Sequence, residues 1–252
     1  MASRSFTRFS APELHPMFNL LPLEVVGRLG VDGLGGITYY FNHFLQWEGP
    51  ANEGGAGGWS LTDATGTSTI DYGNVREGTI VITADATAGA DSCLQLGPTA
   101  GGKNFGYTVG KRMWCFARLQ TSTIATNWKF FFGFCTPTTT PGATAPTNGI
   151  FFRNATNVAD LDLVVKEGAN TTAVASVTTL VAATYVVVGF FVDHTGGVTA
   201  YVNGAAAGHI AAGAAGLATL DGDATKTLQF IIDKKLASAT LTLDWLLIAQ
   251  EI

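Results

Sequence analysis

Residues 185–204, which read YVVVGFFVDHTGGVTAYVNG, constrain the fold of this chain more than any other stretch. Tyr185 to Val192 is an apolar run of β-branched and aromatic residues, which is typical of a buried strand. Turn residues follow at 193–197, where either glycine could adopt a positive φ, and residues 198–202 then alternate as a half-buried strand does. Asn203-Gly204 is a strong hairpin signal, because a type I′ turn needs a positive φ twice. The stretch therefore predicts strand, turn, strand and turn near the middle of an antiparallel sheet.

The rest of the chain predicts many more strands and little helix. Besides the hairpin, strands are expected at residues 37–48, 79–84, 92–96, 112–121, 128–135, 150–153, 161–166, 173–177, 205–210, 228–233 and 241–248, with short β segments within 59–69. In the 112–121 strand, Met113 and Cys115 share one face, and Trp114 and Phe116 share the other. Residues 211–219 (AAGAAGLAT) fit either a helical turn or a tightly packed loop. About a dozen strands suit an all-β, two-sheet antiparallel jelly roll.

Three motifs resemble the concanavalin A-like (lectin/glucanase, laminin-G-like) jelly-roll domains. They are FVDHTGGVTAYVNG within the hairpin, YYFNHFLQW (39–47) with the GGWSLTDATGTSTI that follows it, and TLTLDWLLIAQ (240–250). The last motif is similar to the closing strand of such domains in phage structural proteins. The resemblance covers residues 37–252 and implies a β-sandwich. It leaves function open, because lectins, glycosidases and virion proteins share this fold.

Residues 1–36 differ from the domain at 37–252 and predict an extended N-terminal arm. Pro12, Pro16 and Pro22 interrupt its apolar residues, which argues against a long helix and against a secretory signal. The apolar residues instead predict that the arm docks on its own domain or on a neighbouring subunit, and both alternatives stay open. The expected contact residues are Phe6, Phe9, Leu14, Met17, Phe18, Leu20, Leu21 and Leu23.

The composition indicates a protein that works in an assembly. Charged residues make up only 13% of the 252 residues and hydrophobic residues 47%, so a lone soluble chain would tend to associate. The net charge of −5 and the lack of a Lys/Arg cluster argue against nucleic-acid binding. No apolar run is long enough to predict a membrane span. The cysteines Cys93, Cys115 and Cys135 form no metal-binding motif, and fit buried side chains in a protein made in a reducing cytoplasm.

No constellation of residues predicts an enzyme, and no cofactor is expected. Glycosidases need two carboxylates across a bond, and related glucanases carry Glu-x-Asp-x-(x)-Glu on one strand. This chain has only Asp160 and Asp162, with Glu167 displaced to an expected turn before Gly168, so the pattern does not match. The histidines, among them His194 beside Asp193, stand in no nucleophile motif. Catalytic residues are therefore not expected.

Two kinds of ligand site have weaker signals. Asp193, Asp221 and Asp223 are possible calcium ligands, although calcium needs more oxygens than these carboxylates provide. Trp47, Trp59, Trp114, Trp128 and Tyr201 are candidate glycan-binding aromatics, with Trp47, Trp59 and Tyr201 preferred, although aromatic residues of a jelly roll more often lie in the core. Asp244 lies within an apolar strand, and we expect it to bond to nearby backbone or to an arginine.

These observations lead to an expected function. The chain is expected to be a non-enzymatic phage virion structural protein, a capsid decoration (cement) protein made in the host cytoplasm and placed on the capsid surface. Its expected partners are the major capsid protein and itself, as a homotrimer, with neither nucleic acid nor membrane. The alternative is a carbohydrate-binding module of a phage tail or adhesion structure.

Overall fold

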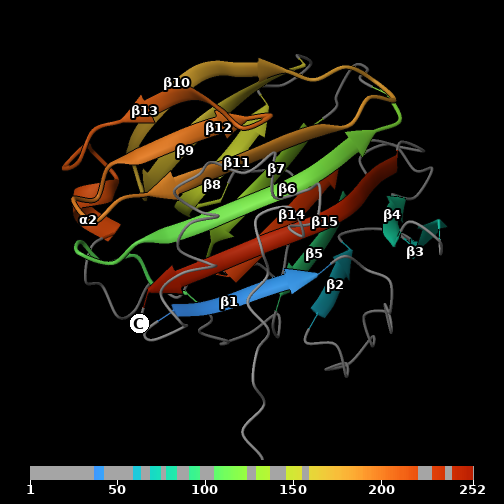
Figure 1. The fold of residues 1–252 in the computed structure, drawn as a ribbon, viewed down its shortest axis with the longest axis horizontal. Coiled ribbons are helices and arrows are strands. Elements are labelled where there is room, and N and C mark those ends of the chain that lie inside the picture. The colour runs from blue at the N-terminus through green and yellow to red at the C-terminus, as the bar shows by residue number, and fades with distance from the viewer. Residues whose placement is uncertain are drawn as a thin grey trace, which may run out of the picture.

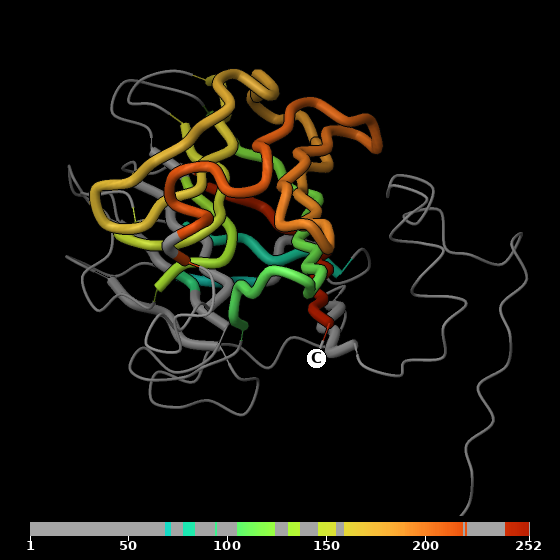
Figure 2. Tube along the Cα trace, turned by 90° about the vertical axis from the view of Figure 1, so that its left-hand side faces the viewer, coloured from blue at the N-terminus to red at the C-terminus, as the bar shows by residue number. Residues whose placement is uncertain are grey.

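The computed structural model describes residues 37–42, 59–63, 69–74, 78–83, 91–96, 105–123, 129–136, 146–154, 159–220, 229–235 and 240–251. These residues form two antiparallel sheets that face each other, as expected (Figures 1 and 2). The expected strands are confirmed wherever the structure describes them, with small differences in their ends.

Sheet A has eight strands in the order β13-β12-β11-β6-β15-β4-β3, and β1 pairs with β15 outside this path. Its strands are β1 (Ile37–Asn42), β3 (Thr69–Asn74), β4 (Thr79–Thr83), β6 (Met113–Thr121), β11 (Val186–Val192), β12 (Val198–Val202), β13 (Ala205–Ile210) and β15 (Thr240–Glu251).

Sheet B has seven strands in the order β10-β9-β8-β7-β14-β5-β2. Its strands are β2 (Trp59–Asp63), β5 (Asp91–Leu96), β7 (Lys129–Cys135), β8 (Asn148–Asn154), β9 (Asp160–Glu167), β10 (Asn170–Thr179) and β14 (Gln229–Lys235).

The last two strands connect two groups of strands that do not otherwise pair. In sheet A, β15 lies between β6 on one side and β4 and β1 on the other. In sheet B, β14 lies between β7 and β5. Within the described part of the chain, β1–β5 are therefore hydrogen-bonded to β6–β13 only through β14 and β15.

The predicted hairpin is confirmed, with one difference in its first turn. Asn203 and Gly204 have φ values of 48° and 85°, as a type I′ turn requires. In the 193–197 turn, Gly196 has a φ of 91°, but Gly197 does not need a positive φ. Gly197 is needed for space, because a Cβ there would lie 2.8 Å from Asp193 Oδ2 and 2.9 Å from His209 Cε1.

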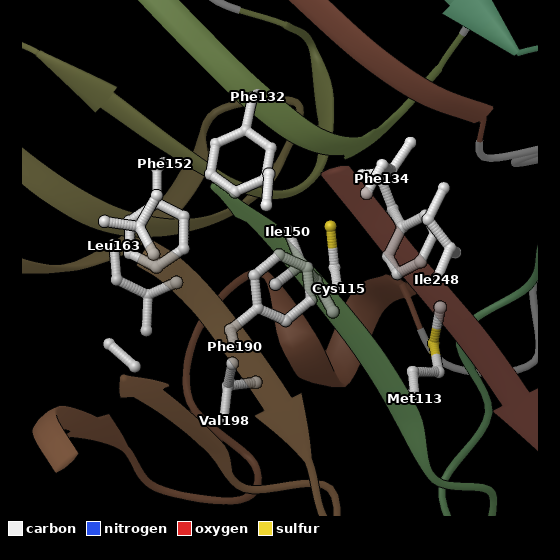
Figure 3. Close-up of a cluster of buried hydrophobic side chains, with 14 of the residues drawn as sticks. Met113, Cys115, Phe132, Phe134, Ile150, Phe152, Leu163, Phe190, Val198 and Ile248 are labelled. Carbon is white, nitrogen blue, oxygen red and sulfur yellow. The ribbon is translucent and has the colours of Figure 1, made fainter. Parts of the chain in front are cut away.

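The core lies between the sheets and is rich in phenylalanine (Figure 3). Phe132 and Phe152 of sheet B stack with ring centroids 5.4 Å apart. Phe190 of sheet A meets Phe134 edge to face at 5.8 Å. Met113 and Cys115 point into this core, while Trp114 and Phe116 belong to a separate cluster on the other side of β6, which confirms the predicted alternation.

Short irregular segments complete the sandwich. Residues 211–216 form turns, and a single helical turn, α2 (Leu217–Leu220), follows and places Leu217 and Leu220 in the core. Both alternatives for 211–219 are thus partly right. Strand β3 was not separately expected, and neither was the bulge at Asp244 between Leu243 and Trp245. Bulges depend on the partner strand, which a local pattern does not reveal.

Candidate assembly surface

One edge of the sandwich is almost free of charge. It consists of β10, β13, the 180–185 turn and the 211–216 turn, and is called the neutral edge below. From residue 168 to residue 220, Asp193 is the only Asp, Glu, Lys or Arg. Alanine, threonine, glycine and valine take the place of charges, and Val181 is 61% exposed. Apart from His209, the exposed residues of β10 and β13, such as Thr171, Ala173 and Ala205, are small and uncharged.

The neutral edge forms because the outermost strands of the two sheets approach each other. β10 ends sheet B and β13 ends sheet A, and the two lie side by side (Figure 1). Gly208 permits this approach, since a Cβ there would lie 2.7 Å from Val174 Cγ1 and 3.2 Å from Val177 Cγ1. Thr172 Oγ1 donates to Ala215 O at 2.9 Å and ties the 211–216 turn to β10.

This composition is unusual for the edge of a sandwich in water. Sheet edges are commonly protected by lysines, other charges or bulges, because their free backbone groups can pair with another chain. β10 has one such device, a bulge at Ser176 with a φ of 52°, but it has no charge. The neutral edge therefore lacks the charges that commonly keep a sheet edge from pairing with another chain.

Asp160 and Asp162, the acids considered for glycoside hydrolysis, hold β10 in place. Asp162 Oδ1 accepts from Ser176 N at 2.9 Å, and so fixes the bulge. Asp160 Oδ1 accepts from Thr179 Oγ1, and its Oδ2 lies 3.5 Å from Ser176 Oγ. Glu167 ends β9 before Gly168, which has a φ of 56°, so the expected turn at this position is confirmed. These bonds give Asp160 and Asp162 a structural role next to the neutral edge.

Asp193 organises the turn between β11 and β12. Its Oδ1 accepts from Thr195 N at 2.7 Å, Thr195 Oγ1 at 2.6 Å and Gly197 N at 3.0 Å. Partial burial acts to raise the pKa of Asp193, but the bonds from Thr195 and Gly197 and the nearby His194 outweigh it, so the pKa lies below its usual value. His209 is exposed, and its Nδ1 lies 3.0 Å from Thr199 Oγ1.

This lowered pKa predicts a pH dependence of stability. In the unfolded chain Asp193 takes up a proton near pH ~3.9, whereas the folded protein resists protonation to a lower pH. The stabilisation by the ionised group is therefore complete above about pH 5 and is lost as the pH falls through the folded pKa. Urea unfolding of the wild type and Asp193→Asn from pH 6 to pH 2.5 should show a steeper decrease for the wild type. Equal slopes would contradict the role of Asp193.

The expectation for Asp244 is confirmed, because its partner is an arginine. Asp244 is 7% exposed, and its Oδ2 accepts from Arg118 Nη1. The Arg118 guanidinium also lies over the Tyr185 ring, 4.1 Å from its centroid. The bulge in β15 places this carboxylate beside β6, where it holds an ion pair on the outer side of sheet A.

The same outer side carries a cluster that we call the aromatic face: Trp114, Phe116, Val187, Phe191, Tyr201, Trp245, Leu247 and Ala249. Trp114 stacks on Phe191 with ring centroids 5.5 Å apart, and Phe116 lies 6.0 Å from Tyr201. The ring of Phe116 lies across Gly189, where a Cβ would collide with it and would lie 2.6 Å from Cys115 O. Of the predicted glycan-binding aromatics, Tyr201 is therefore half-buried against Phe116, and Trp114 is buried in the same cluster.

Several of the predicted site residues belong to segments outside the described ranges. The arm residues 6–23, Trp47, Trp128, Asp221 and Asp223 lie outside the described residues, and for Trp59 only its place at the start of β2 is described. Among the described residues, no group of three or more His, Cys, Asp or Glu side chains is arranged to hold a metal ion. In the same part of the chain, no helix is long and apolar enough to span a membrane.

Two of the cysteines, Cys115 and Cys135, are buried. Cys115 points into the core and Cys135 lies in a small cluster on the outer side of sheet B with Phe131, Phe151 and Val164. Burial raises the pKa of the Cys115 thiol well above its usual value, which disfavours the reactive thiolate. The prediction that these cysteines are buried is confirmed for Cys115 and Cys135.

Comparisons with known proteins identify the fold. No protein-family model matches the chain. No curated protein matches it by sequence. A structure of a protein of unknown function from Shewanella oneidensis MR-1 superposes with a TM-score of 0.59 and 12% identity, over 98% of this chain and 97% of that one.

Lectin and glucanase structures are also similar. The carbohydrate recognition domain of Emp47p has a TM-score of 0.54 and 8% identity, over 86% of this chain and 98% of that one. An endo-1,3-beta-glucanase from Streptomyces sioyaensis has a TM-score of 0.53 and 12% identity, over 86% and 97%. At these identities the likeness concerns the fold alone. The chain thus has the concanavalin A-like jelly-roll fold that the sequence motifs implied.

Proposed function

We propose that this protein is a non-enzymatic virion structural protein, a phage capsid decoration protein that binds the capsid surface and neighbouring copies through its neutral edge. The observation that carries the proposal is the absence of charge on that edge, where Asp193 is the only Asp, Glu, Lys or Arg from residue 168 to residue 220. Burying a charge at an interface is costly unless it is paired, and interface cores are depleted of charged residues. A surface of small, uncharged side chains has little to desolvate when it meets a partner.

The carboxylates beside this edge also support a structural role. The glucanase fold by itself does not decide for an enzyme, since lectin domains share it. In this chain Asp160 and Asp162 bond to the Ser176 amide and the Thr179 hydroxyl, and so they shape β10. The conformation of β10, and with it the shape of the neutral edge, therefore depends on these two carboxylates.

The proposal predicts that charges on the neutral edge block assembly without unfolding the domain. Ala173→Lys and Val181→Lys, at exposed sites on and next to β10, should together abolish incorporation into particles. Thr108→Lys adds one such charge at an exposed site in the loop before β6 and should have no effect. The measurement is the copy number of each variant per particle, by quantitative mass spectrometry of purified phage, with melting curves to verify folding.

The expected wild-type result is a copy number comparable with that of the major capsid protein, with light scattering showing a homotrimer in solution. Undiminished incorporation of the doubly charged variant would overturn the role of the neutral edge. Absence of the wild type from particles, together with saturable binding on a glycan array, would favour the carbohydrate-binding alternative.

A further inference from the structure

The aromatic face is buried although it points away from the core. Trp114 is 2% exposed, and Phe116, Trp245 and Leu247 are each 1% exposed. All four belong to the outer side of sheet A, since their neighbours in sequence, such as Cys115 and Leu246, point into the core. Apolar side chains on the outer side of a two-layer sandwich normally face water, so this burial requires a cover.

The described elements do not supply that cover. Their strands form two layers, and the helical turn α2 contacts β9 of sheet B (Figures 1 and 2). No described strand or helix lies over the outer side of sheet A. The packing of the described strands and helix therefore does not account for this burial.

We propose that the N-terminal arm, residues 1–36, docks on the aromatic face of its own chain. The arm leads directly into β1, and β1 pairs with β15, two of whose residues, Leu247 and Ala249, belong to that face. The register places Ile37 beside Glu251 and Tyr39 beside Ala249, which in turn lies beside Trp114. The arm thus joins the sheet at the end where the Trp114–Phe191 stack lies.

The arm is long enough to cover the whole face. From β1 to β12 the sheet has four steps, through β15, β6 and β11. At ~4.8 Å per step this is roughly 19 Å, which about six extended residues can span. The 36 residues of the arm exceed this several-fold. No long loop has to be closed, because the arm is already held at Ile37 by the pairing of β1.

The chemistry of the two surfaces is complementary. The arm offers eight apolar side chains between Phe6 and Leu23, and the face offers eight apolar side chains, half of them aromatic rings of Trp or Phe. Trp114 Nε1 is buried and has no hydrogen-bond partner. Because buried N–H groups are normally hydrogen-bonded, an acceptor from a docked segment would stabilise it. Pro12, Pro16 and Pro22 favour an extended conformation, and a chain in that conformation makes no internal hydrogen bonds, so its carbonyl groups can accept such a bond. A sugar would instead need several polar groups at the centre of the face, where the side chains are apolar.

Photo-crosslinking in the full-length chain tests this inference. A benzophenone analogue of phenylalanine at position 201 replaces Tyr201, which is half-buried at the border of the face. After irradiation, the crosslinked product should have the mass of one chain and should contain the tryptic peptide of residues 9–28, which Arg8 and Arg28 bound. The same analogue at position 181, on the neutral edge, is the control and should not capture this peptide.

Two results would overturn the inference. One is capture of the 9–28 peptide only in products with the mass of two chains, which would assign the arm to a neighbouring copy. The other is capture of peptides from outside the arm, obtained both at position 201 and with the analogue at position 191. The inference does not rest on the proposed virion role, because particle incorporation and arm docking have separate readouts.

Discussion

Replacing Gly133 with alanine is expected to lower the free energy of unfolding by at least ~3 kcal/mol, because two costs add. Gly133 has a φ of 151°, a region that residues with a Cβ rarely adopt. A Cβ at this position would also collide with Ile150 O and would lie 2.7 Å from Phe151 Cα. These are backbone atoms of the paired strand β8, so they cannot move aside as the end of a flexible side chain could.

The matched control is Gly213→Ala. Gly213 has a φ of 74°, but a Cβ there would meet nothing within 4 Å. This variant has only the conformational cost, about 1–2 kcal/mol for an L-residue in the left-handed region. Chemical unfolding of both variants measures the difference, and failure to recover folded Gly133→Ala agrees with the expectation. Equal stability of the two variants would show that β7 and β8 do not approach each other as described.

Asp244→Ala is expected to cost about 2 kcal/mol, less than the 3–5 kcal/mol typical when a fully buried pair is broken. The side chain of Asp244 is 10% exposed but that of Arg118 is 35% exposed, so water can solvate the arginine when its partner is lost. Arg118 also keeps its contact with the Tyr185 ring. The loss of stability is therefore expected to stay below the ~3–5 kcal/mol that breaking a fully buried pair costs.

Two comparisons isolate the charge of Asp244. Asp244→Asn keeps the shape and one acceptor oxygen, and should lose roughly half as much stability as Asp244→Ala. In an Arg118→Ala background, Asp244→Ala should cost less than in the wild type, because the ion pair is already gone. The measurement is urea unfolding of the five proteins, namely the wild type, the three single variants and the double variant. A loss of less than ~0.5 kcal/mol for Asp244→Ala would mean that the bulge in β15 does not depend on this ion pair.

Local patterns were sufficient to predict most strands of this protein. The hairpin of β11, β12 and β13 was readable because its signals lie within a few residues, namely alternation and the Asn203-Gly204 turn. The two faces of β6 were readable for the same reason. The fold class followed from the number of such strands together with the resemblance of three motifs to one family of domains.

Local sequence patterns do not predict which strands pair with each other. β15 pairs with β1, β4 and β6, which lie far from it in sequence, and nothing local to residues 240–251 specifies them. The neutral edge was missed for the same reason. Its lack of charge is visible in residues 168–220, but only the pairing order shows that β10 and β13 form the outermost strands of both sheets.

The place of β14 and β15 has a consequence for the synthesis of the protein. The ribosome synthesises β1–β13 before these two strands. Until residues 229–251 have been made, β6 lacks its partner β15 and β7 lacks its partner β14. During that interval the nascent chain exposes unpaired strand backbone, which invites association with other nascent chains and recognition by chaperones. Truncated chains that end just before residue 229 should therefore aggregate, even though they contain more than four-fifths of this sequence.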